Sequence, residues 1–235
     1  MTEELFRQDS YVKSCQATVI SVNLEGIVLD RTVFYPEGGG QPGDSGRLLT
    51  GDGRSITIVD TNKGGENINH VSEESAPALS VGDIVTAEID WERRYLHMRV
   101  HTALHVLCAH VDGAVTGGSI GLGKGRLDFD IPGERPQKEV LTAKLMETIK
   151  ADYPLSISWI TDEELEDQPD LVRTMSVKPP IGLGWVRMIR IGDALDFQPC
   201  GGTHLRSTGE IGLIAVGKIE NKGKQNRRIN VALQD

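Results

Sequence analysis

Two short motifs in this chain carry side chains that bind transition metals. His101-Thr-Ala-Leu-His105 and Cys200-Gly-Gly-Thr-His204 each place two such residues four positions apart. On a helix, residues i and i+4 share one face, so His101 and His105 can point at one ion. The two glycines of the second motif permit a tight turn that would bring Cys200 and His204 back toward the same point. Because zinc prefers imidazole and thiolate ligands, the two pairs together predict a zinc site.

His97 and Cys200 each admit a second interpretation. His97 precedes His101 by four residues, so spacing alone would let these two form the helical pair. Otherwise His97 is a phosphate or substrate contact, or a hydrogen-bonded histidine of the helix. Cys200 beside histidines could be a covalent nucleophile, but a thiolate that binds zinc is a poor free nucleophile, which favours ligation. We expect Cys15 and Cys108 to be small buried apolar side chains.

Three segments of the chain resemble a known family. FYPEGGGQPGDSG (residues 34–46), WERRYLHM (residues 91–98, followed by HTALHVL) and DFQPCGGTHLRSTGEIG (residues 196–212) are similar to the editing module of alanyl-tRNA synthetases. The similarity is closest to the free-standing form of this module, the AlaX proteins, and it runs from about Val28 to the C-terminus. It selects His101 and His105 as the helical ligand pair. It implies an enzyme that deacylates mischarged alanine tRNA in trans.

The resemblance also implies where the amino acid binds. In that family the loop corresponding to Gly38, Gly39 and Gly40 borders the aminoacyl pocket, and the AlaX forms that remove serine carry this glycine-rich version. We therefore expect Ser-tRNA(Ala) as the substrate and Gly-tRNA(Ala) as a lesser one. By the same analogy the Thr32 hydroxyl is a candidate contact to the serine side chain, and Gln41 is a second. A synthetase pocket sized for alanine rejects an added hydroxyl only weakly, which creates the need for a second site.

The expected reaction is hydrolysis of the ester that joins the wrong amino acid to the 3′ end of the tRNA. A zinc-bound water would attack, or zinc would polarise and hold the ester, and no protein side chain is assigned as nucleophile. Three protein ligands (His101, His105 and either Cys200 or His204) would leave one coordination position of the zinc open. If all four residues bound, turnover would require a fifth coordination position or the exchange of one ligand. Two other functions stay open. One is a non-catalytic, zinc-stabilised tRNA-binding module, and the other is a metal-dependent hydrolase of small esters.

Charge is distributed unevenly along the chain. The net charge is −9, yet residues 1–92 hold 6 Lys+Arg against 16 Asp+Glu, while residues 93–235 hold 19 against 18. The second part is therefore where an RNA acceptor stem would bind. Composition alone favours a solvated hairpin surface for the basic cluster near the C-terminus. The family resemblance instead favours a tRNA-binding role for this cluster. The candidate tRNA contacts are Lys124, Arg126, Lys222, Lys224, Arg227 and Arg228, with Arg93, Arg94 and Arg99 as the alternative.

Other features argue against whole classes of function. Residues 118–124 match the spacing of a nucleotide-binding loop, but Gly125 stands where Ser or Thr is needed and a strand pattern follows, so we expect no nucleotide triphosphate. No apolar stretch is long enough for a membrane span. Three scattered cysteines and an N-terminus without a basic-then-apolar segment favour the cytoplasm.

The hydrophobic pattern changes near residue 92. Before it, short β-rich runs at 17–23, 26–29, 55–60 and 84–89 predict a small antiparallel barrel, with residues 61–80 as a long loop that has one edge strand at most. After it, helical spacing predicts helices at 91–110 and 136–151, and a capping box at Thr161 starts a third. Strands are expected at 125–131, 155–160, 185–191, 213–220 and 227–233. We therefore expect an α+β fold, with a β-barrel domain of residues 1–92 and an α+β zinc-containing editing domain of residues 93–235.

Overall fold

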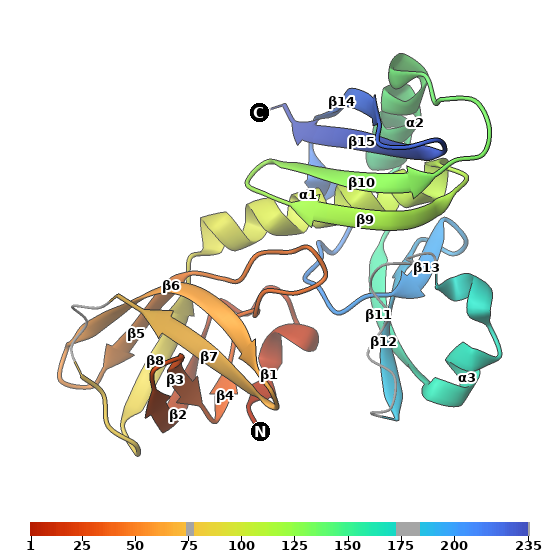
Figure 1. Cartoon of the computed structure of the whole chain (residues 1–235). Coiled ribbons are helices and arrows are strands. Elements are labelled where there is room, and N and C mark those ends of the chain that lie inside the picture. The colour runs from red at the N-terminus through yellow and green to blue at the C-terminus, as the bar shows by residue number, and fades with distance from the viewer. Residues whose placement is uncertain (74–77, 173–183, 235) are drawn as a thin grey trace. The chain divides into compact units, whose positions relative to one another are not determined.

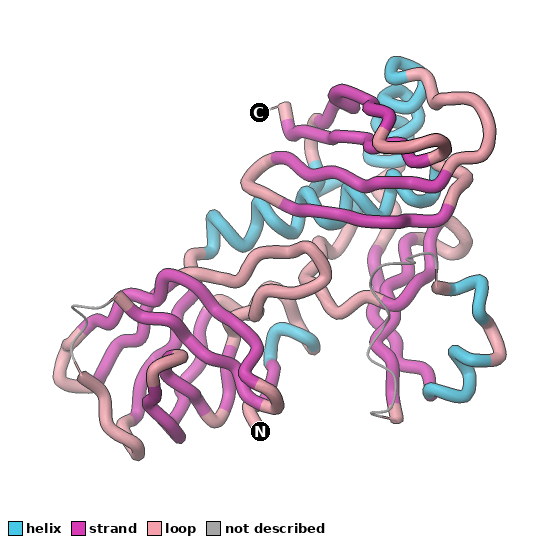
Figure 2. Tube along the Cα trace, viewed as in Figure 1, coloured by secondary structure: helices cyan, strands magenta, loops and turns pink. Residues whose placement is uncertain are grey.

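The protein consists of two compact units, and the boundary between them falls inside one helix. The structure is a computed structural model that describes residues 1–73, 78–172 and 184–234 (Figure 1). The first unit comprises Met1–Tyr95 and the second comprises Leu96–Asp235. The division lies inside helix α1 (Trp91–His110). Figure 2 shows that strands dominate the first unit and that the second contains both helices and strands, which confirms the expected α+β class.

Six strands of the first unit form a closed antiparallel barrel in the order β2-β3-β7-β6-β5-β8. Closure gives each of these strands a neighbour on both sides, which removes the exposed edges that favour aggregation. A short parallel pair, β1 with β4, and the 3-10 helix η1 (Leu5–Arg7) complete the unit. The strands are β1 (Glu3–Glu4), β2 (Ser14–Asn23), β3 (Gly26–Leu29), β4 (Arg31–Thr32), β5 (Gly46–Thr50), β6 (Ser55–Gly64), β7 (Asn67–Ser72) and β8 (Ile84–Ile89).

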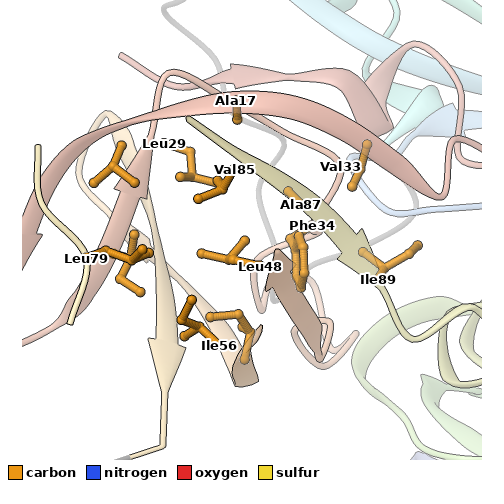
Figure 3. Close-up of a cluster of buried hydrophobic side chains, with 13 residues drawn as sticks. Ala17, Leu29, Val33, Phe34, Leu48, Ile56, Leu79, Val85, Ala87 and Ile89 are labelled. Atoms are coloured by element: carbon orange, nitrogen blue, oxygen red, sulfur yellow. The ribbon is translucent and has the colours of Figure 1, made fainter. Parts of the chain in front are cut away.

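Apolar side chains that alternate along the barrel strands fill the interior of the barrel (Figure 3). In β6, Ile56 and Ile58 are fully buried, whereas the neighbouring Val59 is 47% exposed. Leu48 of β5 and Leu29 of β3 point into the same cluster. Because burying one such side chain contributes about 1.5–3 kcal/mol, this cluster is the main driving force for closing the barrel.

The long loop expected at residues 61–80 was a wrong prediction for residues 61–64 and 67–72, which are strands. Residues 61–64 continue β6, and β7 is paired on both sides within the barrel, with β3 and with β6. The strand pattern is disguised because β7 buries two polar side chains, Asn69 (5% exposed) and His70 (0%). Residues 74–77 of the expected loop lie outside the described residues. Strand β5 was also not anticipated.

A buried ion pair ties the start of α1 to the rest of the first unit. The guanidinium of Arg94 contacts the Asp44 carboxylate, and both side chains are almost completely excluded from solvent. Arg94 also donates to the carbonyl oxygens of Val33 (2.7 Å) and Ser10 (3.0 Å), and Asp44 accepts from the Tyr35 amide (2.7 Å). Extra hydrogen bonds of this kind are what a buried ion pair needs to offset its loss of hydration.

The second unit contains a four-stranded antiparallel sheet in the order β14-β15-β10-β9. Helix α1 packs against β10, where a Cβ added at Gly125 would lie 2.6 Å from Val100 Cγ1. Helix α2 (Lys138–Lys150) packs against β14, and the Val216 amide donates to the Thr142 hydroxyl. The strands are β9 (Ala114–Ile120), β10 (Lys124–Asp130), β14 (Ile214–Asn221) and β15 (Asn226–Leu233). Among the described residues, no helix has the length and apolar character to cross a membrane.

A second, three-stranded antiparallel sheet has the order β11-β12-β13, formed by β11 (Leu155–Thr161), β12 (Trp185–Ile191) and β13 (Asp196–Pro199). Helix α3 (Asp162–Glu166) follows β11 and begins with the expected capping box, in which Thr161 accepts from the Glu164 amide and Glu164 accepts from the Thr161 amide. The remaining short elements are the 3-10 helices η2 (Pro169–Leu171) and η3 (Thr208–Ile211). The expected helices and strands of this half are present, but β9 and β13 were not anticipated.

His70 is a neutral histidine inside the first unit. Its Nδ1 lies 2.8 Å from the Ile27 carbonyl oxygen and its Nε2 lies 2.8 Å from the Thr32 hydroxyl oxygen. Burial lowers the pKa of His70 from 6.5 to about 4, although the hydrogen bond to Ile27 acts in the opposite direction. A neutral ring that donates from Nδ1 to a carbonyl must accept at Nε2, so the Thr32 hydroxyl donates its hydrogen to His70.

Acid should destabilise the protein through His70. Between pH 6.5 and about 4 the unfolded chain binds a proton at this residue and the folded chain does not, so the free energy of unfolding decreases as pH falls. The contribution is fully present above pH 6.5, and about 3 kcal/mol of it is lost on reaching pH 4. Urea unfolding of the wild type and of His70→Gln at pH 7, 5.5 and 4 measures this loss. The variant should show a shallower pH dependence, and equal slopes would contradict the assignment.

Candidate metal centre

Four side chains of the second unit converge on one point. His101, His105, Cys200 and His204 each offer one ligand atom, and these atoms all lie within 4.8 Å of one another. Cys200 Sγ lies 3.5 Å from His101 Nε2 and 3.2 Å from His204 Nε2. The three histidines are 5–8% exposed and Cys200 is half-buried, so the cluster is largely shielded from water. The structure thus brings together the two pairs that the sequence spacing singled out.

Local geometry explains how each pair is presented. His101 and His105 occupy one face of α1, and their ring centroids are 5.3 Å apart. Cys200 directly follows β13, and its amide donates to the Arg187 carbonyl of β12 (3.0 Å). The Arg187 guanidinium in turn donates to the carbonyls of Cys200 (2.7 Å) and Gly202 (3.0 Å). Arg187 therefore fixes the turn that returns His204 to within 4.2 Å of the His101 ring, measured between centroids.

The electrostatics of the cluster favour a thiolate. Burial by itself raises the pKa of the Cys200 thiol, but attraction to His101 and His204 outweighs burial and lowers it well below its usual value. Burial, with repulsion from His101, lowers the pKa of His204 well below its usual value. Burial also acts to lower the pKa of His105, but hydrogen bonds to Asp196 and Cys200 outweigh it and raise this pKa to about 10. A cation at the centre would replace the proton on His105 as the partner of the thiolate.

Two of the distances between donor atoms are close to those around a tetrahedral metal ion. Ligands at about 2.0–2.3 Å from such an ion lie about 3.3–3.8 Å from one another. The two distances from Cys200 Sγ, 3.2 and 3.5 Å, are close to this range. The Gly202 amide lies 3.4 Å from Sγ and donates to it, a contact that stabilises a thiolate. The cluster could therefore hold a metal ion, and its nitrogen and sulfur donors are those of the softer divalent metals.

Polar residues that sequence reasoning missed lie behind the ligands. Asp196 Oδ2 is 2.9 Å from His105 Nδ1 and also accepts from Gln198 Nε2 at 2.9 Å. Thr102 Oγ1 is 3.3 Å from His204 Nδ1. The register of β13 places Asp196 and Gln198 on one face of the sheet, as alternation along a strand requires. That alternation was the available signal, but the strand itself was not anticipated.

The third histidine of the α1 stripe (His97, His101 and His105) and the two other cysteines are buried to different degrees. His97 is 0% exposed on α1, and Cys108 is 4% exposed. Cys15 in the first unit is half-buried, and burial raises the pKa of its thiol. None of the three belongs to the cluster of four ligand candidates.

The glycine-rich run in the first unit forms a tight hairpin turn. Gly38 and Gln41 bond to each other through both pairs of backbone groups, at 3.0 and 2.9 Å. Gly39 and Gly40 have φ of +58° and +83°, as a type I′ turn requires at its two central positions. A Cβ added at Gly39 would meet nothing within 4 Å. Backbone conformation alone is therefore enough to favour Gly39 and Gly40.

Thr32 and Gln41, the two expected polar contacts to the amino acid, are both completely buried in the first unit. The Thr32 hydroxyl accepts from the Phe34 amide (3.1 Å) and donates to His70. The hydroxyl hydrogen of Thr32 is thus already used in the hydrogen bond to His70. The metal-ligand candidates belong to the other unit, Leu96–Asp235.

The basic residues of the second unit are partly neutralised by their own neighbours. Arg228 makes a two-pronged contact with Asp128 (2.8 Å to each oxygen), and Arg126 contacts the same carboxylate at 2.8 Å. These contacts, that of Arg228 first, lower the pKa of Asp128. Lys222 pairs with Glu220 at 2.6 Å.

The remaining basic candidates differ in how they are engaged. Arg227 donates to the carbonyls of Gly223, Lys224 and Asn226 in its own hairpin. Lys124 and Lys224 are exposed, and neither has an ion pair with another described residue. Of the alternative set, Arg94 is fully buried and Arg99 donates to the Ile211 carbonyl (2.9 Å). Arg94 therefore cannot reach an RNA phosphate.

Comparison with known proteins identifies the family. Residues 5–93 match the family of class II (A) tRNA synthetases, and residues 186–230 match the second additional domain of threonyl- and alanyl-tRNA synthetases. An alanine–tRNA ligase of Pyrobaculum neutrophilum is 38% identical over 93% of this chain but only 25% of its own length. The alanyl-tRNA editing protein AlaX-M of Methanosarcina acetivorans is 37% identical over the whole of both chains. That of Methanosarcina mazei is 39% identical over 100% of this chain and 98% of its own. The chain therefore belongs to the AlaX-M family of alanyl-tRNA editing proteins.

Proposed function

We propose that this protein is a zinc-dependent deacylase that hydrolyses alanine tRNA mischarged with serine, and to a lesser extent with glycine. The observation that carries the proposal is the buried cluster of His101, His105, Cys200 and His204, in a chain similar over its whole length to alanyl-tRNA editing proteins. Family membership supports alanyl-tRNA editing, and with it a hydrolase. The choice of zinc rests on the donor set, because imidazole and thiolate are its usual ligands.

Zinc bound here would supply a Lewis acid that activates water or polarises the ester carbonyl. The residues of the chain hold that centre in a dry, rigid setting, with two ligands on α1 and two on a turn fixed by Arg187. Cys200 is poorly suited to attack the ester itself, because its thiolate is surrounded by imidazoles within 3.5 Å. This supports the role of ligand over that of nucleophile.

Serine selectivity is proposed on chemical grounds. A site that pairs with the serine hydroxyl would leave a polar group unpaired when alanine binds, and such sites discriminate by as much as about 10⁴-fold. Thr32 stays the proposed contact by resemblance to the family. Because its hydrogen is committed to His70, Thr32 would act only as an acceptor, and the serine hydroxyl would have to donate. Alanine and glycine have no such donor.

The tRNA is proposed to bind the sheet of the second unit through Lys124, Arg126, Lys222, Lys224, Arg227 and Arg228. The ion pairs described above change the expected order of their contributions. Arg126 and Arg228 share Asp128, and Lys222 faces Glu220, so their charge is partly cancelled. Lys124 and Lys224 should therefore contribute most to phosphate binding.

Metal and activity should be lost together when a ligand is removed. Purified Cys200→Ala should contain far less than the roughly one zinc per chain expected of the wild type, and it should no longer deacylate Ser-tRNA(Ala). Cys108→Ala, which removes a buried thiol outside the cluster, should keep both. Elemental analysis and a deacylation assay measure these properties. Full deacylation by a chelator-treated, zinc-free preparation would rule out catalytic zinc.

The substrate itself is tested by deacylation of alanine tRNA charged with serine, glycine or alanine. Serine should be removed fastest and alanine slowest. Thr32→Val should slow removal of serine by roughly 10- to 100-fold, about 1–3 kcal/mol in the barrier, with little effect on glycine. The melting temperature of the variant separates this effect from the structural loss of the bond to His70. Equal losses on both substrates would mean that Thr32 does not contact the side chain.

Salt dependence tests the proposed RNA surface. Each phosphate contact removed should reduce the slope of log affinity against log salt by about 0.7–0.9. Lys124→Ala/Lys224→Ala should therefore reduce the slope by about 1.5, whereas the control Lys138→Ala/Lys150→Ala on α2 should leave it unchanged. Filter binding at several salt concentrations gives the slopes. If the two double variants have the same salt slope, the tRNA binds to another surface. A wild type that binds tRNA but does not cleave the ester would indicate a non-catalytic module.

A further inference from the structure

We infer that Asp196 and Thr102 select the ring tautomer of His105 and His204, so that the Nε2 atom of each ring presents a lone pair to the metal centre. The inference rests on the proposed metal binding of this cluster and assigns roles to two residues outside it. Both are positioning residues, because they act through the imidazoles. Each contacts the Nδ1 atom of its histidine, the nitrogen that faces away from the centre.

The case for Asp196 follows from the direction of its hydrogen bonds. An ionised carboxylate only accepts hydrogen bonds, so the contact of 2.9 Å requires a hydrogen on His105 Nδ1. Gln198 Nε2 donates to the same oxygen at 2.9 Å and lies 3.0 Å from Nδ1, so two donors share one acceptor. Both carboxylate and imidazole are buried, with side chains 1% and 8% exposed. With its hydrogen held at Nδ1, a neutral His105 has its lone pair at Nε2.

Thr102 plays the corresponding part for His204. A hydroxyl oxygen has two lone pairs and one hydrogen, and the Leu205 amide donates to Thr102 Oγ1 at 3.2 Å, which occupies one lone pair. The second lone pair is available to accept from His204 Nδ1 at 3.3 Å. If the hydroxyl donated to Nδ1 instead, the ring hydrogen would lie on Nε2, which points at Cys200 Sγ 3.2 Å away, and no lone pair would be left for the metal.

The position of Thr102 in the sequence adds a further point. It lies between two metal-ligand candidates on α1 and is 0% exposed, so one stretch of helix supplies two ligands and the acceptor for a third. Leu205 follows His204 directly. The same oxygen therefore fixes both the backbone next to His204 and the orientation of its ring.

The test measures zinc affinity on the purified full chain after metal removal, by competition with a chromophoric chelator. Thr102→Val keeps the size and removes the acceptor, whereas Thr102→Ser keeps the oxygen. Valine at this position should weaken zinc binding 10- to 100-fold, and serine should stay within about threefold of the wild type. Asp196→Asn removes the negative charge but keeps the shape of the side chain, and it should weaken zinc binding about tenfold. The Co²⁺-loaded variants should show a weakened thiolate charge-transfer band.

Thermal melting of the metal-free proteins shows whether the variants are folded. If Thr102→Val is not folded, the test rests on Asp196→Asn alone. Zinc affinity equal to the wild type in both Thr102→Val and Asp196→Asn would overturn the inference. So would a Thr102→Ser variant as weak as Thr102→Val. Because this titration needs no tRNA, a wild type that binds zinc but leaves Ser-tRNA(Ala) intact would contradict the proposed function and leave this inference standing. A wild type that binds no zinc would overturn both.

Discussion

The crowding of four electron-pair donors is the constraint on which the second unit depends. One thiol and three imidazoles lie with their ligand atoms within 4.8 Å of one another, in a place with little access to water. Lone pairs at this distance repel, and burial removes the solvent that would separate them. Only a shared cation or shared protons can stabilise such a group. The helix, the turn held by Arg187 and the acceptors behind the rings all serve to keep it assembled.

The ligand pairs are predictable from sequence because local geometry sets each of them. Four residues along a helix, or across a turn with two glycines, fix a distance whatever the rest of the fold does. The partners behind the rings are fixed by tertiary approach, as Asp196 is separated from His105 by 91 positions. Strand β13 has only four residues, too few for a period-two pattern to stand out from its surroundings.

The same distinction explains the errors elsewhere. Strand β7 was missed because Asn69 and His70 are polar yet buried, and the hydrogen bond from His70 to Ile27 that makes this possible crosses between strands. The basic cluster is visible in the sequence as a set of charges, but which acidic residues pair with them could not be predicted. Asp128 and Arg228 lie 100 positions apart and face each other only because β10 and β15 are neighbours in register.

The turn at Gly39 and Gly40 bears on how relatives of this protein should be compared. Their positive φ favours glycine for the hairpin to close, whether or not an amino acid is ever bound beside it. Gly38 is different: its φ is ordinary, and a methyl group there would meet the flexible end of Lys63 at 3.2 Å and the Tyr35 hydroxyl at 3.5 Å. Invariance of the central pair across evolution would therefore record folding alone. Invariance of Gly38 would need a reason other than backbone conformation, such as its contacts with Lys63 and Tyr35 or a bound ligand, which makes it the more informative position of the three.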